Sequence, residues 1–225
     1  AGRAATVVQD LLTLARRGVY RMTPLNLNAV VEEYLGSPSY AELKAINPHI
    51  VVDVTLAPDL LNMMGSDSHL SKVVMNLVSN AFEAMPQGGT LTIHTTCESL
   101  DRPVAAYVAD GDQFYIEAGD YVVLRVGDTG IGIEENDRDK IFEPFYTKKE
   151  MGRSGSGLGL AIVHGVVHDH QGRIDLRTEI GQGSEFIIYF PVTRENVDEI
   201  ARDSSDWRGN ETVLVVDDLE NQREL

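Results

Sequence analysis

The chain has 225 residues and 43% of them are hydrophobic, which is enough to bury the core of one main domain. A formal net charge of −16 opposes contact with nucleic acid phosphates and with anionic membrane surfaces, and no motif argues for either role. The single cysteine, Cys97, cannot form an internal disulfide, so we expect a cytoplasmic protein. No run approaches the roughly 18 apolar residues of a membrane span, although a longer parent protein could carry an anchor elsewhere.

Both ends of the chain are predicted to belong to neighbouring units. Residues 1–20 carry an apolar stripe at helical spacing that needs a partner helix to cover it. The main domain is expected at 21–194, and a polar, acidic linker at 195–211. Residues 212–225 include a β-branched run that ends in two acidic residues, which predicts the first strand of another unit.

Helices and strands are mixed along the main domain, and several strands follow one another without a helix between them. In chain order we predict a helix ending at Leu35, strands at 50–56 and 62–64, a long helix capped by Asp67 and stopped at Pro86, strands at 90–96 and 121–126 with an insertion between them, a short helix at 134–142, a helix at 158–170 closed by Gly172, and strands at 173–178 and 185–190. This order predicts an α+β fold, a two-layer α/β sandwich with a mixed, mostly antiparallel sheet and helices on one face, rather than a doubly wound sheet.

A first group of polar residues lies on the long predicted helix. Asn76 and Asn80 are four residues apart, so they share one helix face, and Glu83 lies on the same face. A carboxamide oxygen is a neutral, hard ligand that suits Mg²⁺ when substrate phosphates complete the coordination shell. Taken alone, such a pair is more often an ordinary polar helix edge with satisfied hydrogen bonds.

A second group, Asp128-Thr129-Gly130-Ile131-Gly132-Ile133, follows directly after a predicted strand. Its glycines allow the backbone to approach a flat ligand, and the Asp128 carboxylate can accept a hydrogen bond from an exocyclic amine. Such an acceptor distinguishes adenine, which carries an amine, from guanine, which carries a carbonyl at the same position. An ordinary turn after a strand is the alternative.

A third group, Gly155-Ser156-Gly157-Leu158-Gly159-Leu160, stands where a loop enters a predicted helix. Backbone N–H groups and the positive end of the helix dipole can hold phosphate oxygens there. The spacing is not that of a Rossmann loop, and the sequence contains neither a P-loop nor the VAIK, HRD and DFG motifs of protein kinases. A flexible hinge is the alternative.

A fourth group, Phe142-Glu143-Pro144-Phe145-Tyr146-Thr147-Lys148-Lys149, combines aromatic anchors with two lysines. Each lysine offers a point charge that can meet a phosphate. For at least one of the two, a solvated position on the surface is the more common role.

Taken together and in this order, the four groups resemble the N, G1, F and G2 boxes of the histidine kinase catalytic domain, which has the GHKL, or Bergerat, ATP-binding fold. The resemblance covers residues 27–191 and includes 181–186, which are similar to a further Gly-x-Gly-Ser/Thr element near the adenine. It implies ATP and Mg²⁺ as cofactors, Asn80 as the Mg²⁺ ligand and Asp128 as the residue that reads the adenine. Further nucleotide contacts are implied for Glu83, Gly130, Gly132, Ile133, Thr147, Lys148, Lys149, Arg153, Gly155, Gly157, Leu158, Gly159, Leu160 and Ser184.

Two positions set this chain apart within the family pattern. Glu83 stands where many of these kinases have a lysine; in this the chain resembles the nitrogen-regulation-like branch of the family, and the positive charge for the phosphates is then expected from Lys148 or Lys149. Asn76 stands where hydrolysing GHKL ATPases place a water-activating carboxylate, and a carboxamide cannot take a proton from water. We therefore expect slow ATP hydrolysis and transfer of the γ-phosphoryl group to another acceptor, with Asn76, Lys148 and Lys149 as catalytic residues.

In the family, that acceptor is a histidine on a two-helix dimerisation hairpin. Residues 1–20 resemble the end of its second helix, and 212–225 resemble the first strand of a response-regulator receiver domain. None of the 6 histidines stands in a recognisable acceptor motif, and His164 and His168 lack the context of a metal site.

The sequence therefore predicts the ATP-binding domain of a hybrid histidine kinase that is a homodimer as the full-length parent. Its expected partners are the dimerisation domain of the same parent and a receiver domain, with no nucleic acid. The alternatives are a hydrolysing GHKL ATPase and a nucleotide-binding interaction module that has lost transfer chemistry.

Overall fold

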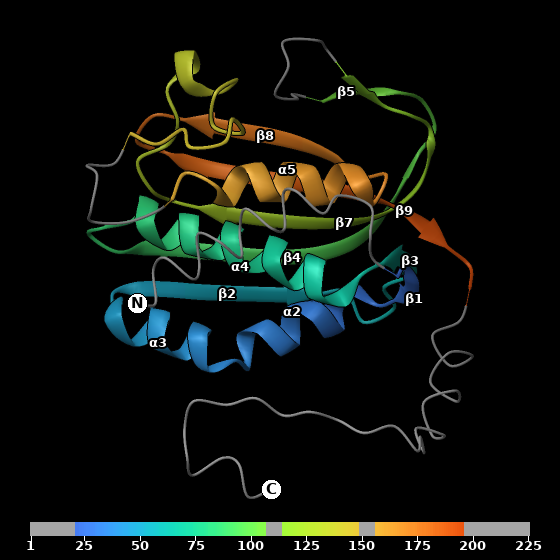
Figure 1. Ribbon diagram of the computed structural model, residues 1–225, viewed down its shortest axis with the longest axis horizontal. Helices are drawn as coiled ribbons and strands as arrows, with labels where there is room; N and C mark the ends of the chain where they lie inside the picture. Colours follow the sequence, from blue (N-terminus) through green and yellow to red (C-terminus); the bar gives the residue numbers. More distant parts are fainter. Residues whose placement is uncertain (1–20, 107–113, 149–155, 196–225) are drawn as a thin grey trace, which may run out of the picture.

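The computed structural model describes residues 21–106, 114–148 and 156–195, and a mixed β-sheet lies at their centre (Figure 1). The elements run in chain order as β1 (Thr23–Leu25), α2 (Leu27–Leu35), α3 (Pro38–Ile46), β2 (Ile50–Leu56), β3 (Asn62–Gly65), α4 (Asp67–Ala84), β4 (Gly89–Leu100), β5 (Val104–Ala106), β6 (Phe114–Ile116), β7 (Gly119–Asp128), the 3₁₀ turn η1 (Glu135–Asp137), α5 (Gly159–Asp169), β8 (Arg173–Glu179) and β9 (Gly183–Thr193).

The main sheet of the described residues has the strand order β1-β3-β9-β7-β4-β2, and β8 also pairs with β9. Among these pairings β2 with β4 is parallel, because the chain passes through β3 and α4 between the two strands, and the other pairings are antiparallel. Figure 1 shows α4 and α5 side by side across one face of this sheet. The predicted α+β sandwich with a mostly antiparallel sheet and helices on one face is therefore confirmed.

The core forms between the sheet and the helices, because alternate residues of each strand face α4 and α5. On α4, buried side chains recur three and four residues apart from Leu70 to Phe82, as the helical period requires. The strand residues buried against them are Leu91, Ile93, Val122, Leu124, Val126, Ile174, Leu176, Phe186, Ile188 and Phe190.

The ends of two helices differ from the sequence-based prediction. Ser66, with extended φ and ψ of −106° and 115°, precedes α4, and Asp67 is the first helical residue, where its charge favours the helix dipole. α5 ends before Gln171, which adopts a left-handed φ of 58°, rather than being closed by a left-handed Gly172. Gly172 is required for a different reason, since a Cβ there would lie 2.9 Å from the Tyr189 carbonyl oxygen.

The sequence pattern also misses β1, α3 and the strands β5 and β6 described below, and it overstates one helix. β1 is only three residues long. The first predicted helix ends at Leu35 as expected, and Pro38 then begins α3, with Ser37 as its cap. The helix predicted at 134–142 is reduced to η1. Several backbone N–H groups there bond three residues back, as Lys140 does to the Asp137 carbonyl at 2.8 Å, and this pattern does not build an α-helix.

The insertion predicted between β4 and β7 contains the hairpin of β5 and β6. This hairpin covers part of the sheet face opposite the helices, where a second, smaller core forms. Its buried residues are Ala106, Ile116, Val123, Ile187 and Tyr189. Polar and charged side chains, among them Thr92, Arg125 and Glu185, lie elsewhere on that face.

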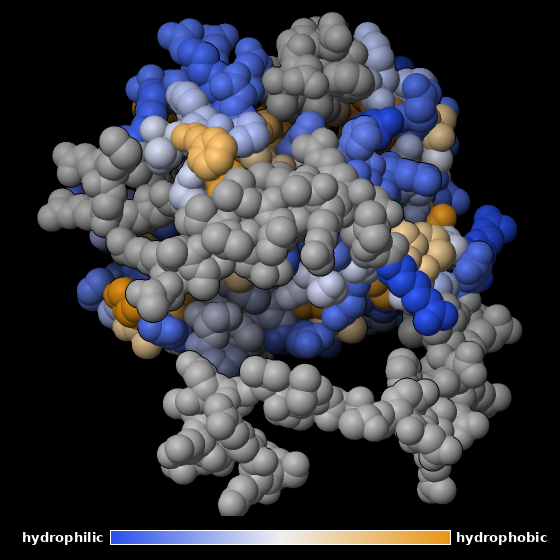
Figure 2. All heavy atoms as spheres, viewed as in Figure 1, coloured by the Kyte–Doolittle hydropathy of each residue, from blue (hydrophilic) through white to orange (hydrophobic). Residues whose placement is uncertain are grey.

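Where Figure 2 shows coloured atoms, most are hydrophilic, and the hydrophobic ones form small separate patches. In the described ranges, we find no helix with the length and apolarity that a membrane crossing requires. The predicted helix end at 1–20, nearly all of the linker at 195–211 and the predicted strand at 212–225 lie outside the described residues, so these assignments stay predictions.

Candidate functional site

A cavity of about 520 Å³ opens between α4, the loop after β7, the segment after η1 and the start of α5. It brings together residues from all four groups that the sequence singles out. The predicted site residues that line it are Asn76, Asn80, Glu83, Asp128, Gly132, Ile133, Thr147, Lys148, Gly157, Gly159, Leu160 and Ser184.

α4 runs along this cavity from Asn76 to Ala84. At one end, a Cβ on Gly159 would lie 3.2 Å from Asn76 Oδ1, so the absence of a side chain lets the start of α5 approach closely. At the other end, the Ala84 carbonyl accepts a hydrogen bond from the Ile131 N–H at 3.1 Å. With a rise of about 1.5 Å per residue, these two points are about 12 Å apart along the helix. The cavity therefore has two ends with different walls.

Asn80 lies between the two ends, on the same face of α4 as Asn76. Its Nδ2 atom is buried and has no hydrogen-bond partner among the described residues. Leaving a buried amide unpaired costs about 1–3 kcal/mol. This arrangement indicates that a ligand with oxygen atoms completes the surroundings of the Asn80 carboxamide.

Asp128 occupies the second end of the cavity, at the last residue of β7. Burial, the largest influence, raises the pKa of its carboxyl group, and hydrogen bonds from the backbone N–H groups of Gly130 and Ser184 oppose that rise. The Gly130 N–H donates to Asp128 Oδ1 at 2.8 Å. Gly130 does not line the cavity, so its role in this structure is to orient the carboxylate.

Apolar residues and a close backbone contact form part of the wall near Asp128; we call this part of the cavity the slot. Gly132 has a φ of 71° and its Cα packs against the Glu179 carbonyl, which leaves no room for a side chain. Ile131 and Ile180 line the cavity and are 64% and 66% exposed, an unusual exposure for large hydrophobic side chains. Apolar side chains beside a carboxylate suit a flat ring that carries an amine.

Thr178 connects the loops that form this slot, although no sequence motif singles it out. Its Oγ1 accepts a hydrogen bond from the Ile133 N–H at 2.9 Å and lies 2.9 Å from Ser184 Oγ. The Gly181 N–H donates to the Ile131 carbonyl at 2.9 Å and ties the same two loops together. These contacts fix the slot without touching its interior.

Lys148 is the described lysine of the fourth group, and two carboxylates hold it. Its Nζ lies 2.7 Å from Glu134 Oε2 and also forms an ion pair with Asp137 Oδ2. The Tyr146 hydroxyl donates to Asp137 Oδ1 at 2.7 Å. These hydrogen bonds, those with Lys148 first, lower the pKa of Asp137, and the two carboxylates raise the pKa of Lys148.

The start of α5 forms the remaining wall. The Gly157 carbonyl accepts a hydrogen bond from the Phe145 N–H at 2.9 Å, and Ser156 Oγ accepts one from the Leu158 N–H at 3.3 Å. The Leu158 side chain is fully buried in the core and does not line the cavity. Backbone N–H groups at Gly159 and Leu160 lie at the positive end of the helix, where anions are favoured. Lys149, Arg153 and Gly155 lie outside the described residues, so their contacts stay predictions.

A model of the family of histidine kinase-, DNA gyrase B- and HSP90-like ATPases matches residues 65–194. The chain belongs to this family. Sensor kinase CckA of Brucella abortus is 32% identical over 97% of this chain, which spans only 23% of the length of CckA.

Among solved structures, the catalytic domain of histidine kinase ThkA is 26% identical, with a TM-score of 0.57 over 77% of this chain and 97% of that domain. Full-length ShkA in complex with AMPPNP is 25% identical, with a TM-score of 0.58 over 85% of this chain and 36% of ShkA. The matched domain is therefore the GHKL ATP-binding domain that sensor histidine kinases contain.

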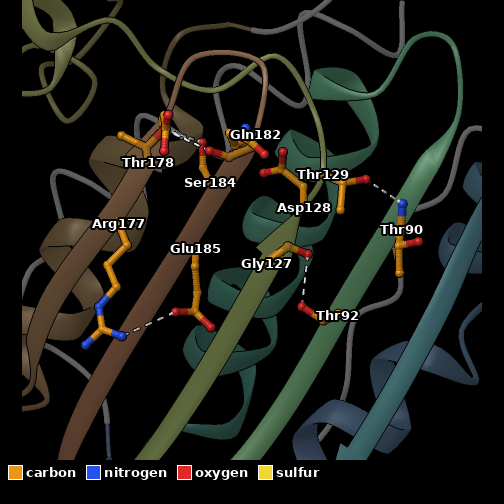
Figure 3. Close-up of a pocket in the computed structure, with 12 residues that line it drawn as sticks. Thr90, Thr92, Gly127, Asp128, Thr129, Arg177, Thr178, Gln182, Ser184 and Glu185 are labelled. Carbon is orange, nitrogen blue, oxygen red and sulfur yellow. Dashed lines mark hydrogen bonds and ion pairs between the residues drawn. The ribbon is translucent and has the colours of Figure 1, made fainter.

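This GHKL domain has a second, polar hollow of about 450 Å³ on the open face of the sheet (Figure 3). Asp128 lines it as well as the first cavity. Thr92 Oγ1 donates to the Gly127 carbonyl at 3.3 Å there, and Arg177 pairs with Glu185 at 3.9 Å. The α4 asparagines and the start of α5 do not line this hollow. Of these two cavities in the described part of the chain, the one on the helix side combines Asp128 with groups suited to phosphates, so we assign the site to it.

Proposed function

We propose that this domain binds ATP together with Mg²⁺ and that the full-length parent transfers the γ-phosphoryl group to a histidine of its dimerisation domain. The observation that carries the proposal is the shape of one cavity. The slot at Asp128, where the carboxylate can accept a hydrogen bond from an amine, continues along α4 into a polar region formed by Asn80 and the positive end of α5.

The adenine is proposed to lie in the slot between Gly132, Ile133 and Ile180. An ionised Asp128 accepts a hydrogen bond from the exocyclic amine, and guanine would present a carbonyl oxygen to the same carboxylate. A buried, unmatched pair of acceptors costs about 1–3 kcal/mol, so the slot selects adenine over guanine.

The phosphates are proposed to lie between Asn80, Lys148 and the start of α5. The Asn80 carboxamide suits this place in two ways: its oxygen is a neutral ligand of the kind that Mg²⁺ accepts, and its Nδ2, which has no partner among the described residues, can donate to a phosphate oxygen. When bound, Mg²⁺ would neutralise charge on the phosphate oxygens. The domain itself supplies positioning through Asn80, through the N–H groups of α5 and through the ammonium of Lys148.

Asn76 favours transfer over hydrolysis. It lies beside Gly159, at the phosphate end of the cavity, and a carboxamide cannot act as the base that activates water. A γ-phosphoryl group in this position therefore reacts slowly with water and remains for an acceptor brought by the parent protein.

The partners follow from this reaction. We propose that the acceptor histidine comes from the dimerisation domain of a homodimeric parent and that a receiver domain takes the phosphoryl group next. We also propose a cytoplasmic location, which suits both the use of ATP and the exposed free thiol of Cys97. The name of CckA as a sensor kinase and the complex of ShkA with AMPPNP support the part of the proposal that concerns ATP and a kinase reaction.

Calorimetric titration of the 225-residue chain with ADP and Mg²⁺ tests the proposal, beside Asp128→Asn and a parallel assay of phosphate release from ATP. We expect saturable ADP binding and negligible phosphate release by the wild type. Asp128→Asn should bind ADP about 10- to 100-fold more weakly, because a hydrogen bond to a charged group contributes about 1.5–3 kcal/mol. Absence of ADP binding by the wild type would contradict the ATP site. Rapid phosphate release would favour a hydrolysing ATPase instead.

A further inference from the structure

The charge of Lys148 is already compensated within the cavity. Glu134 and Asp137 both pair with its ammonium group, and all three residues line the cavity. A lysine ammonium has three donors, so these carboxylates engage two of them. Two carboxylates and one ammonium together carry excess negative charge, which opposes the approach of a phosphate.

The fold holds the two carboxylates to different degrees. The Asp137 side chain is 10% exposed and is fixed by the Tyr146 hydroxyl as well as by Lys148. The Glu134 side chain is 59% exposed and precedes η1, so it can rotate into water at little cost. Of the two partners of Lys148, Glu134 is therefore the one that a competing anion displaces.

We propose that Glu134 competes with the nucleotide phosphates for Lys148, and that Asp137 is the positioning residue that keeps Lys148 at the cavity when the phosphates displace Glu134. This inference rests on the function proposed above. Once Glu134 has moved to solvent, Lys148 and Asp137 form a neutral pair with donors left for a phosphate oxygen. Binding of a phosphorylated nucleotide is thus coupled to the loss of one exposed ion pair, whereas binding of the nucleoside alone is not.

Calorimetric titrations with ADP–Mg²⁺ and with adenosine test the inference on the 225-residue chain and on Glu134→Gln, Asp137→Asn and Glu135→Gln. Glu135 is the matched control, because it is an exposed carboxylate one residue away from Glu134. We expect Glu134→Gln to tighten ADP binding about three- to fivefold, the factor that corresponds to an exposed ion pair. Asp137→Asn should weaken ADP binding, and the adenosine affinity should stay unchanged in both variants.

Three outcomes would overturn the inference. They are an unchanged ADP affinity in Glu134→Gln, an equal gain in Glu135→Gln, and a gain from Glu134→Gln that persists when Lys148 is replaced in Lys148→Gln. Absence of ADP binding by the wild type would contradict the proposed function instead, so the two failures are distinguishable. If Asp137→Asn does not fold by circular dichroism, Tyr146→Phe replaces it, and an unweakened ADP affinity in that variant overturns the positioning role.

Discussion

Lowering the pH below 6.5 is expected to destabilise the domain through His170. This residue follows α5, and only 3% of its surface is exposed. Its Nε2 accepts a hydrogen bond from the Ser66 N–H at 3.0 Å, and Nδ1 lies 2.7 Å from the Val166 carbonyl, to which it donates. Both bonds require a neutral ring with its proton on Nδ1, so protonation of Nε2 would set two N–H groups against each other.

The sign of the effect follows from the shifted pKa. Burial, the largest influence, lowers the pKa of His170 below its ordinary 6.5. Above pH 6.5 the imidazole is neutral in both the folded and the unfolded chain, so its contribution to stability is fully present. Below that pH the unfolded chain binds a proton that the folded chain does not, and one such proton costs at most about 1.4 kcal/mol per pH unit. For a domain of this size, that corresponds to a Tm lowered by about 3–5 °C per pH unit.

Urea unfolding followed by circular dichroism at about pH 7.5, 6.5 and 5.5 measures this slope. His170→Gln should show a shallower slope, because glutamine can accept from the Ser66 N–H without titrating. His168→Gln is the control, since that side chain is 74% exposed. In both variants, some dependence of the free energy of unfolding on pH should remain, because burial also lowers the pKa of His69. A wild-type slope in His170→Gln would refute the reasoning.

Three further predictions concern the cavity. Gly132→Ala should abolish detectable ADP binding by calorimetry, because a Cβ would collide with a carbonyl of β8, whereas Gly181→Ala, also at a positive φ of 76° but with nothing within 4 Å, should retain it. Thr178→Val should lower the free energy of unfolding by about 1–3 kcal/mol in urea titrations and weaken ADP binding, since it leaves the Ile133 N–H without its acceptor. Asn80→Ala should remove most of the Mg²⁺ dependence of ADP affinity while leaving adenosine binding intact, and an unchanged Mg²⁺ dependence would contradict the role of the carboxamide.

The parts of the site that lie in contiguous motifs could be predicted from the sequence. Asp128 and Gly132 belong to one run after a strand, and a carboxylate followed by glycines is recognisable without any tertiary information. Asn76 and Asn80 are recognisable because helical spacing places them on one face. The family resemblance joined these segments, and the structure places them around one cavity.

Other features depend on contacts between segments that are distant in sequence. Thr178 follows no motif, and its importance arises only because β8 ends beside the loop that carries Ile133. Lys148 and Glu134 are 14 positions apart in a segment whose sequence has no helix or strand periodicity, so no local pattern indicates that they pair. The local pattern around Pro38 also gives only half of the structure: it indicates that the first helix ends, and the structure shows that Pro38 is the first residue of the next helix.

The position of the carboxylate along α4 bears on whether the γ-phosphoryl group of ATP is transferred to an acceptor or hydrolysed by water. Among the residues of α4 that line the cavity, the carboxylate is Glu83, which lies next to Ala84 at the Asp128 end. Asn76, beside the start of α5, is seven residues earlier and thus about 10 Å away along the helix. A general base acts within about 3 Å of the proton that it removes, or through one water. Glu83 is therefore too distant to activate water at the proposed γ-phosphate, and the α4 residue at that end of the cavity, Asn76, carries a carboxamide instead of a base.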